Sequence, residues 1–348
     1  MIYRMIVTAL IAIVFLTPSM ASTSDFKDIL DVPALKSPLA IKYLLNGIAA
    51  AGKRLVSVGQ RGHILYSDDG GRSWTQANVP VSSDLTAVSF PSPKKGWAVG
   101  HDGVVLFSED GGVNWVKQFD GRDASRVMQG YYTAHPLGAN VMEDVNRLIQ
   151  EGLEKSFLDV CFEDERNGFI VGAFNLIFHT TDGGKNWEPW FDRTENEGSL
   201  HLYAIKRIGN DIFITGEQGL VMKLDLEAKK FRRMKTPYQG TFFGITGRDG
   251  MLVVFGMRGN VFCSSNRGAS WQKVETEVTV GLTGATVADD GRIILVSQAG
   301  EVLVSKNGGL SFSMVKVDKP FLAAAIAAID RDAVVLVGFG GVELEFIK

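Results

Sequence analysis

The chain has 348 residues, is 45% hydrophobic and carries a formal net charge of −3 at pH 7. This near-neutral balance lacks the excess of basic residues with which nucleic-acid-binding proteins hold phosphates, so we expect no nucleic-acid partner. The five histidines are not paired at the spacing typical of metal ligands, and we therefore expect neither a metal nor a cofactor.

The first 21 residues have the pattern of a secretory signal peptide. Arg4 supplies a positive charge, residues 5–16 form an apolar run, and Ser19 and Ala21 form a small-x-small cleavage site. The apolar run is too short to span a membrane comfortably. We therefore expect a signal peptide at 1–21, a mature chain of residues 22–348, and a periplasmic protein that is at most peripheral to the membrane.

A repeated phrase dominates the rest of the chain. It reads VGQRGHILYSDDGGRSW at 58–74, VGHDGVVLFSEDGGVNW at 99–115 and VGAFNLIFHTTDGGKNW at 171–187, and weaker copies begin at 215, 255, 296 and 337. The first glycine of the phrase, or its counterpart, falls at Gly59, Gly100, Gly172, Gly216, Gly256, Ser297 and Gly338. Successive copies are 41, 72, 44, 40, 41 and 41 residues apart, a period typical of β-propellers.

Each copy also contains four short strand-like runs. In the second copy these runs are 85–90, 96–100, 104–108 and 114–120, which are rich in Val, Phe and Trp and separated by Gly and Asp. The sequence therefore predicts an all-β fold, a seven-bladed β-propeller of four-stranded blades. A β-sandwich is the alternative, and seven evenly spaced copies disfavour it.

The turn between the third and fourth runs has the most regular chemistry. Its pattern is Ser/Thr-x-Asp/Asn-x-Gly-x-x-aromatic, carried by Ser67, Asp69, Gly71 and Trp74; Ser108, Asp110, Gly112 and Trp115; Thr180, Asp182, Gly184 and Trp187; Ser264, Asn266, Gly268 and Trp271; and Ser305, Asn307, Gly309 and Phe312. Short Asp or Asn side chains can bind backbone N–H groups inside the turn, and Gly supplies a positive φ. We expect a structural role rather than a catalytic or calcium-binding one.

This turn motif is the Asp-box, or bacterial neuraminidase repeat. Joined to the V-G-x-x-G phrase, as in GWAVGHDGVVLFSEDGGVNW at 96–115, it resembles the photosystem II stability/assembly factor family over nearly all of 41–348. The resemblance implies a non-enzymatic propeller that binds a membrane-protein or secreted client during assembly. It also implies an arginine-rich binding patch. We expect a monomer with such a client.

One insertion interrupts the even spacing, at about 121–155 after the second blade. Its second part, 139–156, places Met142, Val145, Leu148, Ile149 and Leu153 at helical spacing. The chain path predicts that the insertion emerges on the face that carries the G-x-x-G turns, where insertions of repeat proteins often bind partners. The helix either packs on the propeller through its apolar stripe or docks a client, and the sequence leaves both open.

Basic and aromatic side chains are predicted to gather on that same face. They are Arg61 and Arg258 in G-x-x-G turns, Arg122, Arg126, Tyr131 and Tyr132 in the insertion, and Arg193 between the third and fourth blades. Arg and Tyr are enriched at interfaces, so we take these seven residues as candidate client-binding residues. The alternative is that the arginines are ordinary solvated side chains.

The last copy ends after its third strand, at Lys348. Residues 26–32, FKDILDV, resemble a strand and precede the first copy. We expect this run to supply the outer strand of the last blade, which would close the ring without an open sheet edge.

Two other functions share parts of this pattern. A sialidase-like glycoside hydrolase also contains Asp-boxes, and it needs a tyrosine nucleophile with a glutamate partner and three converging arginines. Tyr131 or Tyr132 with Glu163 or Glu217 could form the pair, but no spacing joins them, and the Arg-Ile-Pro phrase typical of sialidases is absent. Binding of a glycan or small ligand in the axial pocket is neither supported nor excluded.

Overall fold

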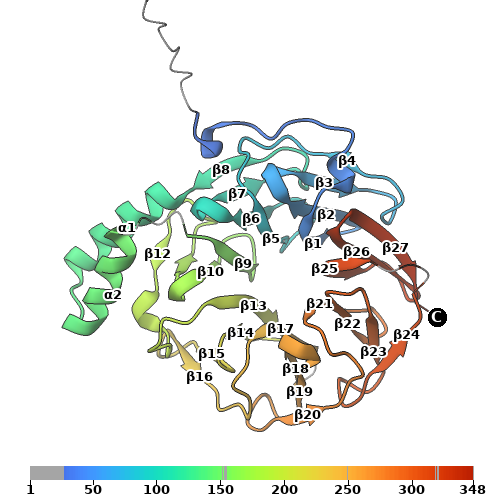
Figure 1. Cartoon of the computed structure of the whole chain (residues 1–348). Coiled ribbons are helices and arrows are strands. Elements are labelled where there is room, and N and C mark those ends of the chain that lie inside the picture. The colour runs from blue at the N-terminus through green and yellow to red at the C-terminus, as the bar shows by residue number, and fades with distance from the viewer. Residues whose placement is uncertain are drawn as a thin grey trace, which may run out of the picture.

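The computed structural model describes residues 27–348, apart from 151, 153, 154, 249, 318, 320 and 348 and the side chain of 140. The predicted signal peptide, Phe26 and Leu153 lie outside the described residues. Seven antiparallel sheets are arranged around one axis, as Figure 1 shows. The predicted seven-bladed β-propeller is therefore confirmed.

Within each blade the strands follow one another from the axis to the rim. Blade one contains β1 (Leu45–Ala51), β2 (Arg54–Gly59), β3 (Ile64–Ser67) and β4 (Thr75–Gln76). Blade two contains β5 (Leu85–Ser89), β6 (Gly96–Gly100), β7 (Val105–Ser108) and β8 (Val116–Phe119). Blade three contains β9 (Phe157–Phe162), β10 (Gly168–Gly172), β11 (Ile177–Thr180) and β12 (Glu188–Pro189).

The remaining blades repeat this order. Blade four contains β13 (Leu202–Ile208), β14 (Asp211–Gly216), β15 (Val221–Asp225) and β16 (Lys230–Arg233). Blade five contains β17 (Phe242–Arg248), β18 (Met251–Gly256), β19 (Val261–Ser264) and β20 (Gln272–Val274). Blade six contains β21 (Leu282–Val287), β22 (Ile293–Ser297), β23 (Val302–Ser305) and β24 (Ser313–Val315), and blade seven contains β25 (Leu322–Ala328), β26 (Ala333–Phe339) and β27 (Gly341–Phe346).

The core lies between neighbouring blades, because each sheet packs both of its faces against another sheet. Every residue of β6 and β10 is buried for this reason, and these strands read as continuous apolar runs rather than as an alternation. The Asp-box aromatics lie in these inter-blade layers, with Trp115 and Trp187 buried.

The Asp-box turns have the structural role expected of them. Ser67 Oγ donates a hydrogen bond to Asp69 Oδ1 at 2.8 Å and accepts one from the Gly71 N–H at 2.9 Å. Asp69 Oδ1 also accepts the N–H of Ser73, and Trp74 Nε1 donates to the Gly71 carbonyl. The same Ser/Thr-to-Asp/Asn and Gly-to-Ser/Thr bonds recur in blades two, three, five and six. These bonds occupy the Asp-box carboxylates within their own turns.

The predicted closure by residues 26–32 is wrong. The described part of this run forms a 3₁₀ turn, η1 (Ile29–Asp31), in which Asp28 Oδ1 accepts the N–H of Leu30. The Ile29 carbonyl accepts the N–H of Ser82, so the run is held beside blades one and two, far from β27 (Figure 1). Blade seven has three strands among the described residues, and a second 3₁₀ turn, η2 (Ala40–Lys42), packs against β27.

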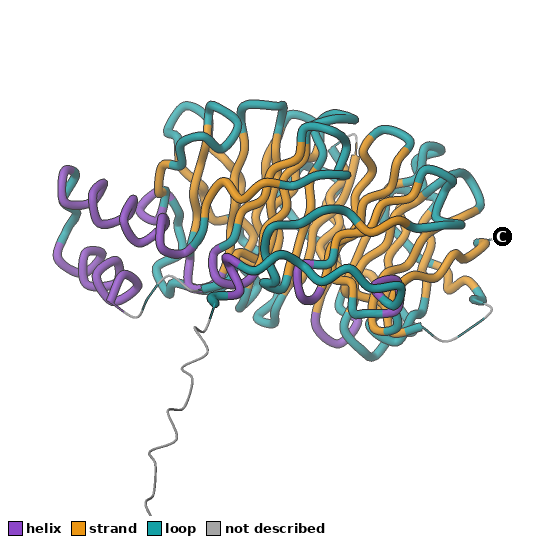
Figure 2. Tube along the Cα trace, turned by 90° about the horizontal axis from the view of Figure 1, so that it is seen from above, coloured by secondary structure: helices purple, strands orange, loops and turns teal. Residues whose placement is uncertain are grey.

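The insertion contains two helices, α1 (Gly121–Ala134) and α2 (Ala139–Gln150). The second was predicted and the first was not. Figure 2 shows both helices beside the ring rather than over either of its faces. Ala124, Met128, Tyr132, Val145 and Leu148 are buried in one cluster with aromatic residues of blades two and three, so the apolar stripe packs on the propeller. None of the described helices is long and apolar enough to cross a membrane.

Candidate functional site

The turns between the second and third strands of the blades present a row of side chains on one face. We call this face the turn face. In each of the first five blades one non-glycine residue of the turn has a positive φ between 51° and 58°, namely Arg61, Asp102, Phe174, Gln218 and Arg258. Side chains other than Gly rarely adopt this backbone conformation, which costs about 1 kcal/mol. Four of the five side chains are exposed, and Asp102 is half-buried and receives a hydrogen bond from Ser83.

In blades one, four and five the glycine that follows this residue is needed because the next inter-blade connection lies close to it. A Cβ on Gly62 would lie 2.1 Å from the Val81 carbonyl oxygen, and one on Gly259 would lie 1.9 Å from that of Val278. Blade three differs, because Asn175 occupies the position and is buried there. Its side-chain amide donates to the Phe191 carbonyl at 3.0 Å, which ties the turn to the connection after β12.

Phe174 is the most exposed aromatic side chain of the turn face in blades one to six, with 45% of its surface accessible. Its ring lies 4.4 Å from the ring of His201 and 4.6 Å from Lys155 Nζ. A pocket of about 210 Å³ opens beside it, where α2 approaches blade three. Its lining comprises Asp144, Arg147, Leu148, Lys155, Phe174, Phe191 and Ser199. We call this the helix–turn pocket.

The helix–turn pocket combines an apolar wall with charged side chains. Phe174, Phe191 and Leu148 supply the wall, and Asp144, Arg147 and Lys155 are the charged residues of its described lining. Arg147 Nη2 donates to Asp144 Oδ1 at 2.7 Å. The arrangement suits an apolar side chain with a neighbouring carboxylate.

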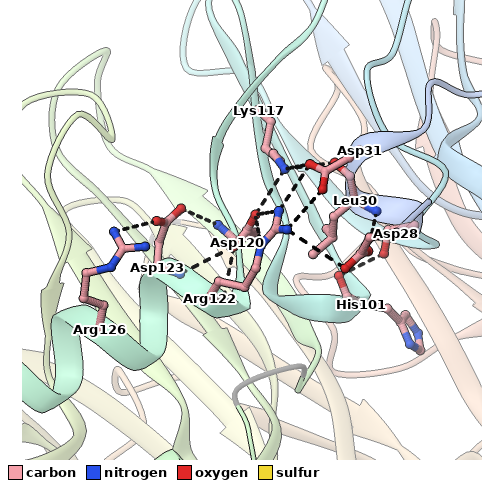
Figure 3. A network of polar contacts seen from close by, with 10 residues as sticks. Asp28, Leu30, Asp31, His101, Lys117, Asp120, Arg122, Asp123 and Arg126 are labelled. Atoms are coloured by element: carbon pink, nitrogen blue, oxygen red, sulfur yellow. Dashed lines mark hydrogen bonds and ion pairs between the residues drawn. The ribbon is translucent and has the colours of Figure 1, made fainter. Parts of the chain in front are cut away.

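Arg122, a predicted client-binding residue, is exposed and takes part in an intramolecular network, shown in Figure 3. Its guanidinium donates to Asp120 Oδ2 at 2.6 Å and to Asp31 Oδ2 at 3.1 Å. Lys117 Nζ donates to Asp31 Oδ1 at 2.9 Å and to the Leu30 carbonyl. The network joins the start of α1 to the N-terminal segment, and the two hydrogen-bonded cations lower the pKa of Asp31 to about 2.

Tyr131, Tyr132 and Arg193 form a second internal network, at the rim of blade three. Arg193 Nη2 donates to Tyr131 Oη at 2.8 Å and to Glu188 Oε1 at 2.7 Å. Tyr132 Oη donates to Asp192 Oδ1 at 2.8 Å from a buried position, and this burial raises the pKa of Tyr132. These contacts fasten α1 to β12 and to the 3₁₀ turn η6 (Phe191–Arg193).

The other three predicted residues are exposed, as is Arg122. Arg61 and Arg258 lie in turns of blades one and five, and Arg126 pairs with Asp123 on the outer side of α1. The structure thus separates them from one another and from the helix–turn pocket. Sequence reasoning missed Phe174, Arg147 and Lys155, although the phrase VGAFN already placed an aromatic residue where the other copies have Arg, Asp, Gln, Ala or Gly.

The contacts of Tyr131 and Tyr132 differ from those of a sialidase nucleophile. Glu217, one suggested partner, accepts the backbone N–H of His201, while Tyr131 donates to Glu188. One arginine, Arg193, contacts Tyr131, where a sialidase brings three arginines together. Among the described residues no three His, Cys, Asp or Glu side chains form a cluster that could hold a metal ion.

Comparisons with known proteins agree on one family. The family model described as "Photosynthesis system II assembly factor YCF48" matches residues 27–121 and 140–315. The photosystem II assembly lipoprotein Ycf48 of Synechococcus sp. (strain CC9902) is 27% identical over 124 residues, which cover 34% of this chain and 37% of that protein. The chain therefore aligns with little more than a third of that relative's length.

Solved structures agree on the fold. A structure described as YCF48 bound to D1 peptide superposes with a TM-score of 0.65 at 17% identity and covers 91% of this chain and 99% of that one. YCF48 from Cyanidioschyzon merolae gives the same TM-score and identity, with 89% and 97% covered. Residues 122–139 of this chain, which the family model does not match, contain almost all of α1.

Proposed function

This chain belongs to the YCF48 family of photosystem II assembly factors, and from that premise we propose that it is a non-enzymatic assembly factor for a membrane-protein client. The family match across both sides of the insertion is the observation that supports this function most directly. A structure of the same fold is described as YCF48 bound to D1 peptide, so this fold can bind a peptide. The client of this chain is accordingly proposed to be bound through an exposed segment.

We propose that the segment binds on the turn face, in the helix–turn pocket. An apolar side chain of the client would pack on Phe174, and an acidic group beside it would lie near Arg147 and Lys155. Exposed aromatic and arginine side chains are frequent anchors at interfaces, which supports this position. A periplasmic location, following cleavage after Ala21, would place the propeller beside the exported domains of such a client.

The test is a crosslinking pull-down from the membrane fraction of the native host. Wild-type protein is expected to capture one dominant membrane protein, and Phe174→Ala to capture roughly tenfold less, since a central aromatic anchor contributes about 2 kcal/mol or more. Leu226→Ala is the matched control, because Leu226 is 70% exposed and lies in the β15–β16 turn of the opposite face.

A second pair of variants separates this pocket from the predicted arginine patch. Arg61→Ala combined with Arg258→Ala removes the two exposed turn arginines, and Arg331→Ala removes another exposed arginine, near the start of β26. If capture is lost only in the double arginine variant, the client binds at the predicted arginines and not in the helix–turn pocket. Capture of no membrane protein by the wild type would overturn the proposed function.

A further inference from the structure

The first strands of the seven blades surround an axial channel with a volume of about 180 Å³. At one level of this channel six blades carry only glycine or alanine, at Gly47, Ala87, Ala204, Gly244, Gly284 and Ala325. Blade three carries Asp159 at the corresponding position, opposite Val171 of β10. The small residues let neighbouring blades approach closely, since a Cβ on Gly47 would lie 3.2 Å from Ala87 Cα and one on Gly284 would lie 3.0 Å from Ala325 Cα. Asp159 departs from this pattern.

Asp159 pairs with a lysine of the next blade. Asp159 Oδ2 accepts the N–H of Ile205 at 2.9 Å, and Lys206 Nζ lies 3.4 Å from the same oxygen. Asp159 Oδ1 accepts the N–H of Val160 at 2.9 Å, so two peptide groups already hold the carboxylate. Asp159 and Lys206 are the two charged side chains among the residues that line the channel.

Lys206 keeps capacity for a further acceptor. Its ammonium group has three N–H donors, and the contact with Asp159 is long for a charged hydrogen bond. Half of the side chain is solvent-accessible although the blades surround it, so water in the channel reaches the ammonium group. The neighbouring Asp159 charge raises the pKa of Lys206, which keeps the lysine protonated.

The channel also has an apolar part. Tyr203 and Phe243 lie side by side in its lining, with ring centroids 5.5 Å apart. Tyr203 and Lys206 are three residues apart on β13, which corresponds to about 10 Å along a strand. A narrow ligand of that length could contact both the ring pair and the ammonium group.

We propose that the axial channel is a carboxylate-binding site, with Lys206 holding the carboxylate and Tyr203 and Phe243 contacting the apolar part of the ligand. Two sources have this chemistry: a free aliphatic acid, and the C-terminal carboxylate of a peptide. The site stands independently of the client-binding function proposed above, because it needs neither Phe174 nor the insertion.

The experiment is isothermal titration calorimetry of the purified protein with four probes: hexanoate, hexanamide, N-acetyl-trialanine with a free C-terminal carboxylate, and its C-terminal amide. At least one carboxylate probe is expected to bind, and its amide to bind roughly tenfold more weakly, because a hydrogen bond to a charged group is lost. Hexanoate alone would identify a free acid as the ligand, and the peptide alone would identify a chain terminus.

Three variants test the assigned lysine. Lys206→Met should weaken binding by roughly tenfold, whereas Lys206→Arg should retain it, since the positive charge is kept. Lys223→Met is the matched control, because Lys223 belongs to the same blade and pairs with Asp211 at 2.9 Å outside the channel. The proposal is overturned if neither carboxylate binds, if acids and amides bind equally, or if Lys206→Met leaves the affinity unchanged. Client capture by Phe174→Ala is measured separately, so the two proposals can fail independently.

Discussion

Two junctions of the ring are filled in different ways. Between blades two and three, Trp97 stacks on Phe162 with centroids 3.6 Å apart, and α1 and α2 extend the same aromatic cluster to the rim. Between blades seven and one, the contact consists mainly of aliphatic residues such as Leu55 and Val335, with Trp74 packed against them, and no strand is shared among the described residues. The η2 turn covers this second junction from outside.

The difference shows that one repeated blade can be joined to its neighbour by unlike side chains. The first junction depends on a few large rings, so its stability is concentrated in single residues. The second depends on many small contacts and on the close approach of Gly71 to Val335, so it is sensitive to added volume. We therefore expect the first junction to be destabilised most by removing a large side chain, and the second by adding one.

The largest effect is expected from Trp97→Ala. Trp97 is fully buried, and its Nε1 donates to Gln118 Oε1 at 3.1 Å. Removing the ring should lower the free energy of unfolding by about 3–5 kcal/mol. Urea denaturation measures this loss, with Val116→Ala as a control from the exposed surface of the same blade. A loss below about 1 kcal/mol would show that the aromatic junction is not where stability is concentrated.

Gly71→Ala tests the other junction. Gly71 has φ +85°, and a Cβ there would lie 2.5 Å from Val335 Cγ2. The strained backbone and the clash together should cost about 2–3 kcal/mol in the free energy of unfolding. Adding Val335→Ala should recover part of this loss, and a double-mutant cycle measures the coupling. Gly70→Ala is the control, since it also has positive φ but its nearest contact is 3.3 Å; purely additive effects would argue against the clash.

A smaller loss of stability is expected when the hydrogen bonds that join α1 to blade three are removed. Tyr132→Phe removes the buried hydrogen bond to Asp192 and should lower the free energy of unfolding by about 1–2 kcal/mol. Tyr131→Phe removes a bond at a half-buried position and should cost less. Thermal denaturation of both variants compares them. Equal losses would mean that burial does not set the strength of these bonds.

The smallest effect should come from the exposed Asp31 network and should depend on pH. Hydrogen bonds from Arg122 and Lys117 lower the folded-state pKa of Asp31 from 3.8 to about 2. Because the pKa of Asp31 is lower in the folded than in the unfolded state, its charge stabilises the fold at pH values above the unfolded-state pKa. This stabilisation is lost as the pH falls toward the folded-state pKa. Asp31→Asn should therefore be less stable than wild type at pH 6, and the gap should narrow between about pH 4 and pH 2. Urea denaturation across this range is the measurement, and a gap independent of pH would contradict the assignment.

The blades and Asp-boxes could be predicted because their determinants are local and repeated. Each Asp-box closes within a few residues, so its bonds follow from spacing alone. The first insertion helix was missed because Gly121, Gly130 and two tyrosines weaken its helical signal. Its start is marked by a capping box between Asp120 and Asp123, which uses Asp at both positions.

Two other features depend on contacts between distant residues. FKDILDV resembled a strand, yet the bond from Ser82 to Ile29 and the burial of Leu30 hold it on blades one and two. Tyr132 meets Asp192 across 60 residues of sequence, and Arg122 meets Asp31 across 91. A single sequence gives no sign of such pairs, so residues that fasten the insertion could not be told apart from residues free to bind a client.

The left-handed turn positions have a consequence for how this surface can change. Arg61, Asp102, Phe174, Gln218 and Arg258 share one backbone conformation but no common chemistry. The backbone cost of this conformation is about 1 kcal/mol for unbranched side chains, lower for Asp and Asn and higher for β-branched residues, so several kinds of side chain can occupy it. The turn face therefore acts as a fixed frame with interchangeable contacts, and relatives of this protein could acquire new partners by single substitutions at these positions while the ring stays intact.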